Sequence, residues 1–154
     1  MPMSTDTAPP ANLYLIVGYD GSAPSTRALD AAVRLLQGRA GRIDVLYVAH
    51  LPAADSLSPD AIGELEIDFG DIAQELRSSA GEQLNGHEDR WDFVRRDGQI
   101  ADELMKYATG LGEAHPGDTA AIVVGSSTQA MHRIVGSVAV TLARHSPVPI
   151  VVVP

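Results

Sequence analysis

The stretch "VVGSSTQAMHRIVGSVA", residues 123–139, follows directly from the most apolar segment of the chain. It begins as the end of a strand, continues through polar residues, and reaches Gly136-Ser137 at the start of a predicted helix. A connection between a strand and a helix needs only about two to six residues. Gly125 and Gly136 stand eleven positions apart. Because glycine lets a ligand approach the backbone and a helix amino terminus attracts anions, this spacing indicates an anion-binding loop.

The same residues also have a purely structural interpretation. Gly125 would then mark the exit from a strand, and Ser137 would cap the following helix with its side chain. The specific motifs of nucleotide-binding proteins and hydrolases are absent, because the sequence has no G-x-x-x-x-G-K-[ST], no G-x-G-x-x-G and no G-x-S-x-G. Composition alone leaves both interpretations open.

Short apolar runs alternate with helical patterns on both sides of this stretch. The predicted strands cover residues 13–18, 42–50, 90–98, 119–125 and 148–154. The predicted helices cover residues 25–37, about 59–84, 100–111 and 137–144. Such alternation predicts an α/β fold with a parallel sheet and helices on both faces, because parallel strands are joined by right-handed helical crossovers.

Ligands of open parallel sheets bind beyond the carboxyl ends of the strands, at the point where the strand order reverses. The first and fourth strands are natural neighbours at that point. The segments that leave them are "GYDGSAPS", residues 18–25, and the stretch that follows Gly125. Asp20 follows the first strand, where it stabilises the Asp-Gly turn or caps the coming helix, and a binding role is compatible with either.

Composition restricts the class of protein. The 154 residues fit a single domain over residues 12–154, with residues 1–11 read as a disordered tail. No apolar run approaches the roughly 18 residues of a membrane helix, and a net charge of −9 argues against nucleic acid as a partner. The absence of cysteine excludes disulfides and thiolate chemistry, so the expected location is cytoplasmic.

The histidines show no spacing typical of a zinc site, so a metal site built from side chains is not expected. The pair His132-Arg133 lies inside the candidate anion loop. Arg133 is either a fork that binds phosphate or a solvated loop residue. Both interpretations remain open at the level of sequence.

Four segments, in this order, resemble the universal stress protein family. They are "LIVGYDGSAPSTRALDAAVRLL" (15–36), "IDVLYVAH" (43–50), "VRRDGQIADELMKYA" (94–108) and "AAIVVGSSTQAMHRIVGSVAVTLARHSPVPIVVVP" (120–154). The resemblance implies a Rossmann-like, five-stranded parallel sheet of order 3-2-1-4-5 and a dimer. It also implies a stress-response function. Many members of this family bind ATP with a divalent cation such as Mg²⁺ at the phosphates.

The family's nucleotide pattern is Gly, two residues, Gly, nine residues, then Gly followed by Ser or Thr. Gly125 matches its first glycine and Gly136-Ser137 its closing pair, whereas Asp20 and Val48 match positions beside the adenine. The implied nucleotide-binding residues are Tyr19, Asp20, Val48, Gly125, Ser127, Thr128, Arg133, Gly136, Ser137 and Val138.

The sequence departs from this pattern in the middle of the loop. Thr128 replaces the second glycine, and only seven residues, 129–135, separate it from Gly136. The loop is therefore two residues shorter than the pattern, with a Cβ where backbone approaches phosphate. Family members that lack the motif do not bind ATP, which keeps a nucleotide-free alternative open.

Three functions follow from these observations. The first is a cytoplasmic stress-response module that binds ATP or a related adenine nucleotide as a sensor or regulator, without efficient turnover. The alternatives are a nucleotide-free homodimeric interaction protein and a slow ATP hydrolase that uses His132 or Asp20 as proton acceptor. No residue is placed as an obvious base for water, which favours a binding module over an enzyme.

The last predicted strand, "VPIVVVP", is expected to form the dimer interface. It is apolar on both faces and uncharged, and it lies at a sheet edge in the implied strand order. An exposed edge of this kind pairs readily with another chain. Pro149 removes one backbone donor and so limits the length of pairing. A twofold arrangement would close the assembly as a homodimer.

Overall fold

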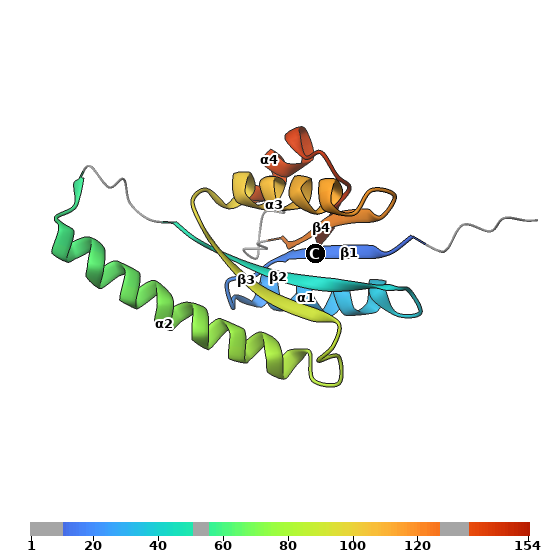
Figure 1. Ribbon diagram of the computed structural model, residues 1–154, viewed down its shortest axis with the longest axis horizontal. Helices are drawn as coiled ribbons and strands as arrows, with labels where there is room; N and C mark the ends of the chain where they lie inside the picture. Colours follow the sequence, from blue (N-terminus) through green and yellow to red (C-terminus); the bar gives the residue numbers. More distant parts are fainter. Residues whose placement is uncertain (1–10, 51–55, 127–135) are drawn as a thin grey trace, which may run out of the picture.

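A computed structural model describes residues 11–50, 56–126 and 136–154 of the chain, and its strands and helices alternate along the whole of this part. The elements are β1 (Leu13–Gly18), α1 (Ala23–Leu36), β2 (Gly41–Ala49), α2 (Pro59–Gln83), β3 (Trp91–Asp97), α3 (Ile100–Ala114), β4 (Thr119–Gly125), α4 (Ser137–His145) and β5 (Ile150–Val153). Figure 1 shows the sheet in the middle of the molecule with helices on either side.

The strands form one sheet in the order β3-β2-β1-β4-β5, and every neighbouring pair is parallel. In the register of the central strand, Val17 lies beside Val45 of β2 and Val123 of β4. The predicted α/β class, the parallel sheet and its order 3-2-1-4-5 are therefore confirmed. Both edges are occupied by the strands with the least buried sequence, β3 and β5.

Two apolar layers hold the helices on the two faces of the sheet. One layer joins β1, β2 and β4 to α1 and α2, with Leu29 and Leu84 fully buried in it. The other joins the opposite faces of the same strands to α3 and α4 through Leu104 and Leu142. The central strands are buried on both sides, which explains why their sequences are continuously apolar.

The ends of two elements differ from the prediction for reasons that the contacts explain. Helix α1 begins at Ala23, two residues early, because the Ser22 hydroxyl accepts a hydrogen bond from the Ser25 amide at 3.4 Å and caps the helix. Strand β5 begins at Ile150, two residues late. The Val148 amide donates to the Ser146 hydroxyl at 3.2 Å, so this residue belongs to a turn before the strand.

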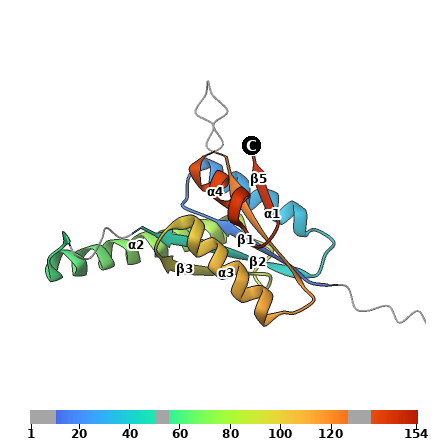
Figure 2. The same cartoon turned by 90° about the horizontal axis from the view of Figure 1, so that it is seen from above.

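Helix α2 confirms the predicted long helix but covers the sheet only in part. Of its residues Pro59–Gln83, Ala80 is the one that is buried. The amino-terminal half extends past the sheet, as the views of Figures 1 and 2 agree in showing. None of the helices in the described ranges is long and apolar enough to span a membrane. Residues 1–10 of the predicted tail lie outside those ranges.

Candidate functional site

A cavity of about 230 Å³ opens at the carboxyl ends of β1 and β4. The chain proceeds from β1 to β2 on one side, whereas β4 lies on the other, so the strand order reverses at this point. The sequence predicted that the segments after these two strands meet here. Gly18, Asp20 and Ser22 from the first segment line the cavity together with Gly125 from the second, as expected.

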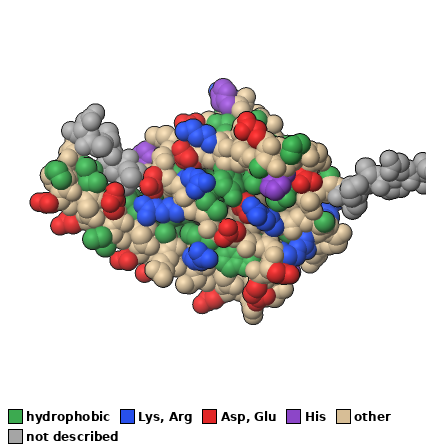
Figure 3. Space-filling model, viewed as in Figure 1, with side chains coloured by type: hydrophobic (Ala, Val, Ile, Leu, Met, Phe, Trp, Pro, Cys, Tyr) green, Lys and Arg blue, Asp and Glu red, His purple; other side chains and the backbone are tan. Residues whose placement is uncertain are grey.

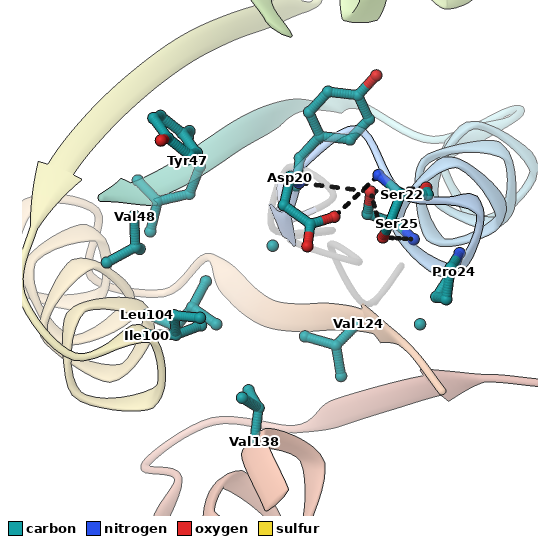
Figure 4. A pocket seen from close by; sticks show the side chains of 14 residues that line it. Asp20, Ser22, Pro24, Ser25, Tyr47, Val48, Ile100, Leu104, Val124 and Val138 are labelled. Carbon is teal, nitrogen blue, oxygen red and sulfur yellow. Dashed lines mark hydrogen bonds between the residues drawn. The ribbon is translucent and has the colours of Figure 1, made fainter. Parts of the chain in front are cut away.

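The cavity has an apolar wall and a polar rim. Figure 4 shows the side chains of Val48, Leu104, Val124 and Val138 around it, with Asp20 on the opposite side. Small-molecule sites commonly measure about 300–1,000 Å³, with apolar walls and a few convergent polar groups. The volume of this cavity is below that range.

The polar rim is a tightly hydrogen-bonded turn at the start of α1. The Ser22 amide donates to Asp20 Oδ1 at 3.0 Å, and the Ser25 hydroxyl donates to the Ser22 carbonyl at 3.0 Å. The Asp20 amide in turn donates to the Ser25 hydroxyl at 3.4 Å. Asp20 therefore stabilises the turn, as one interpretation of the sequence held, while the helix cap is Ser22. The Asp20 carboxylate itself stays exposed at the rim.

The hydrogen bonds of this turn favour the charged form of Asp20. Burial alone would raise the pKa of Asp20, but the hydrogen bonds from Ser22 and Ser25 outweigh it and hold the pKa below its ordinary value of 3.8. A depressed pKa contributes stability that is present above pH 3.8 and lost as the pH falls through the lower folded-state value.

Asp20→Asn is therefore expected to destabilise the protein at pH 7 by at most about 1 kcal/mol, since exposed charges are screened by water. The difference from the wild type should shrink as the pH falls below 3.8, where the wild-type carboxyl also becomes neutral. Urea unfolding at pH 7 and at low pH measures both values. A difference that stays constant with pH would show that the charge of Asp20 contributes nothing.

Tyr19 borders the cavity, but its side chain packs elsewhere. The side chain is 5 % exposed and belongs to the apolar layer beneath α1 and α2. The Tyr19 amide donates to the Leu46 carbonyl at 2.9 Å, which ties the end of β1 to β2. Burial raises the pKa of the Tyr19 hydroxyl. Stacking of this ring on a ligand would require it to leave the core.

Gly125 sits in the tightest part of the site. A Cβ added at this position would collide with the carbonyl oxygen and the Cβ of Pro24, in the first turn of α1. Beyond it, the Ser126 amide donates to the Val153 carbonyl at 2.8 Å, and Arg27 donates to the Ser126 carbonyl at 3.4 Å. The packing of α1 on β4 thus requires glycine at this position, which is also the last residue of β4.

The amino terminus of α4 opens beside the cavity. Gly136 is its N-cap, and its carbonyl accepts the first helical hydrogen bond from the Val140 amide at 3.1 Å. The interpretation that Ser137 caps the helix is wrong, because Ser137 is already its first residue. Among the described residues, no side chain caps the first turn of α4. Amides at a helix amino terminus point outward and attract anions. Val138, in the same turn, lines the cavity.

Three of the predicted binding residues, Ser127, Thr128 and Arg133, lie outside the described residues, and so does His132. Their roles stay predictions. In the described part of the chain, no group of three or more His, Asp or Glu side chains is arranged to hold a metal ion.

Sequence reasoning missed the contribution of the third helix to the site. Ile100 and Leu104 line the cavity from the first turns of α3. A signal was present, because this helix follows β3 at the same carboxyl edge of the sheet. Sequence reasoning also missed Ser22 and Ser25, although a serine two residues before Pro24 is typical of a helix start.

The sequence profile of the universal stress protein family matches residues 15–154. Among solved structures, UspA from Lactobacillus plantarum is 19% identical with a TM-score of 0.73, over 95% of this chain and 100% of that one. A universal stress protein in complex with cAMP is 23% identical with a TM-score of 0.63, over 94% of this chain and 98% of that one. A family member from Arabidopsis thaliana with AMP bound is 12% identical with a TM-score of 0.61, over 92% of this chain and 90% of that one. No curated protein sequence matches the chain. At these identities the structures share the fold.

Proposed function

Because the chain belongs to the universal stress protein family, we propose that it binds an adenine nucleotide at the cavity between β1 and β4. It acts as a cytoplasmic sensor or regulator without efficient turnover. The observation that carries this proposal is the joint position of an apolar cavity and the amino terminus of α4, which no described side chain caps, at the switch point of the sheet. The location rests on the absence of cysteine.

The adenosine half fits the cavity itself. Val48 and Leu104 line the cavity and offer apolar surface to a purine. Asp20, exposed at the rim and ionised at neutral pH, is placed to accept hydrogen bonds from an exocyclic amine or from ribose hydroxyls. The cavity of about 230 Å³ leaves the phosphates outside, toward Gly125 and α4.

The phosphates fit the amides at the start of α4. Ser137 and Val138 lie in its first turn, where the helix dipole also favours negative charge. Ser127, Thr128 and Arg133 remain the predicted further contacts, with Mg²⁺ at the phosphates when ATP is the ligand. Relatives of this fold contain cAMP or AMP. Nucleotides with fewer phosphates than ATP are therefore part of the proposal.

ATP with Mg²⁺, AMP and adenosine are each expected to raise the melting temperature, in the order of their affinities at equal concentration. A ligand at a hundredfold excess over its Kd stabilises the native state by about 2.7 kcal/mol, or roughly 5–10 °C for a domain of this size. Thermal unfolding with each ligand, together with calorimetry, measures this effect. If millimolar ligand neither shifted the melting temperature nor gave heat of binding in calorimetry, the nucleotide-free interaction protein would be favoured.

Two variants locate the site. Val48→Trp fills the cavity and should remove the ligand-induced shift, whereas Val140→Trp on the exposed side of α4 (37 % exposed) should leave it unchanged. Circular dichroism confirms that each variant is folded. A full shift in Val48→Trp would place the nucleotide elsewhere. If the wild type released phosphate from ATP over hours and Val48→Trp did not, the protein would instead be a slow ATP hydrolase.

The protein is also expected to be a homodimer that pairs through β5. This edge strand contains no charged residue, and within the described residues its one neighbour is β4. Val152 is 38 % exposed, whereas Val151 and Val153 pack on the core beneath α1, so Val152 is the better probe of the interface. Val152→Lys should convert a dimer into a monomer, because it buries a charge in the pairing surface.

Sedimentation velocity at micromolar concentration measures the mass of both forms. Val140→Lys, an equally exposed valine on α4, is the control and should keep the dimer. An unchanged mass in Val152→Lys would place the interface elsewhere, and a monomeric wild type would exclude the dimer altogether.

A further inference from the structure

The amino-terminal half of α2 projects beyond the sheet, and few residues of the body cover it (Figures 1 and 2). Two of its isoleucines are largely exposed, Ile67 by 66 % and Ile72 by 41 %. The carboxyl-terminal half is different, because Leu76 and Ala80 pack on the apolar layer under α1. One helix therefore has an anchored end and an overhanging end.

The overhanging end continues an apolar stripe that begins on the body. The stripe, called here the α2 seam, consists of Ile62, Leu65, Phe69, Ile72 and Leu76. Its spacings of three and four residues alternate, which is the pattern by which one helix packs along another. Within the seam, Leu76 packs against the core and Ile72 is exposed. The other three seam residues are half-buried; they are Ile62, Leu65 and Phe69. Ile67 lies on the opposite side of the helix, outside the seam.

Acidic residues surround the seam. Between residues 57 and 76 the sequence contains no lysine or arginine, but it contains Asp60, Glu64, Glu66, Asp68, Asp71 and Glu75. Glu66 flanks the seam on one side, and Asp68 and Glu75 flank it on the other. None of the ion pairs among the described residues involves these carboxylates. In Figure 3, acidic side chains surround apolar ones over this end of the molecule.

A hollow of about 610 Å³ lies beside Glu66, with the end of β3 as its other wall. The basic residues of that wall are engaged. Arg95 pairs with Asp97 at 3.0 Å, and the Arg96 guanidinium lies 5.4 Å from the centre of the Tyr107 ring. Arg96 keeps its positive charge in that wall, but residues 57–76 contain six carboxylates and no lysine or arginine, so the net charge around the seam is negative.

We propose that the α2 seam is the docking surface for a positively charged amphipathic helix of a partner protein. The apolar residues of that helix would cover Leu65, Phe69 and Ile72 of the seam. Its lysines or arginines would meet the three acidic residues that flank the seam. A second copy of the chain does not fit, since pairing two α2 seams would bring acidic flanks together. Nucleic acid and anionic lipid are repelled by the same charge.

The probe for this proposal is a synthetic helical peptide of three heptads. In each heptad, leucine occupies the two positions that would face the α2 seam, and lysine occupies the positions beside them. A second peptide carries glutamate in place of each lysine. Fluorescence anisotropy with the full chain should give micromolar binding of the lysine peptide, at least about tenfold weaker in 0.5 M salt because exposed charges are screened. The glutamate peptide should not bind. No binding of the lysine peptide, or equal binding of both, would overturn the proposal.

Two substitutions on α2 form a matched pair. Ile72→Asp places a carboxylate in the seam and should weaken the lysine peptide at least about tenfold, because apolar contact is lost. Ile67→Asp makes the same change on the opposite side and should leave its affinity within about twofold. Both side chains are exposed, so both variants should fold. Equal losses of affinity would show that the peptide does not dock along the seam and would overturn the proposal. A fall in mass of Ile72→Asp would also overturn it, because it would identify a second copy as the occupant.

Discussion

Asp44→Ala should lower the free energy of unfolding by about 3 kcal/mol, the lower part of the range for removing one partner of a buried ion pair. Asp44 is 1 % exposed in the middle of β2. Its carboxylate accepts a hydrogen bond from the Tyr107 hydroxyl at 2.7 Å and pairs with Arg42 Nε at 2.9 Å. The substitution leaves both donors without an acceptor. Arg42 is 41 % exposed and is able to turn to water, which limits the loss.

The Tyr107 hydroxyl is held as a donor in this arrangement. Burial, followed by the hydrogen bond and charge of Asp44, raises the pKa of Tyr107 above its ordinary value. The hydroxyl therefore stays protonated throughout the physiological range and fastens α3 to β2. Asp44→Asn, which keeps the volume but removes the charge, should recover part of the stability. Urea unfolding followed by circular dichroism measures all the variants.

A pair with the same sequence spacing provides the control. Arg95 and Asp97 on β3 are also two residues apart and 3.0 Å from each other, but their side chains are 28 % and 48 % exposed. Asp97→Ala should cost less than about 1 kcal/mol, as is usual for an exposed pair. If Asp44→Ala and Asp97→Ala lowered the free energy of unfolding equally, burial would not explain the contribution of Asp44 to stability.

The sequence allowed the strands to be predicted because the central ones are buried on both sides and therefore continuously apolar. It did not indicate what Asp44 does within "RIDVLYVAH", because its partner Tyr107 is 63 residues away and reaches it only through the packing of α3. Local patterns carry no information on such a contact. The same limit explains why the boundaries of α2 were predicted while its overhang was not.

The position of the candidate site was predictable for a topological reason. The carboxyl ends of β1 and β4 meet wherever the order 3-2-1-4-5 holds, so Asp20 and Gly125 had to lie near each other. The orientation of Tyr19 follows from the alternation of side chains, since Gly18 and Asp20 border the cavity while the tyrosine ring packs under α1. The contribution of Ile100 depends on the angle of α3, which no local pattern gives.

Gly125→Ala should destabilise the protein by about 1–3 kcal/mol, as overpacking does in a tightly packed core. The new Cβ would occupy the space of the Pro24 carbonyl, so the first turn of α1 would have to move away from the end of β4. Pro24 and Gly125 both line the cavity, and the displacement should weaken any nucleotide bound there. Thermal and urea unfolding measure the stability, and ligand-induced shifts in melting temperature measure the binding.

Gly110→Ala is the matched control, because the same methyl group is added where, apart from the adjacent residues and the backbone of α3 itself, no described atom comes within 4 Å of it. Gly110 lies in the interior of α3, so alanine should stabilise the helix by about 0.5–1 kcal/mol. If Gly125→Ala lowers the free energy of unfolding while Gly110→Ala raises it, the need for glycine at position 125 comes from its contact with Pro24. A Gly125→Ala protein that kept full stability but lost the nucleotide would instead assign the glycine to the ligand. The two interpretations of the stretch after β4 thus make different predictions for one methyl group.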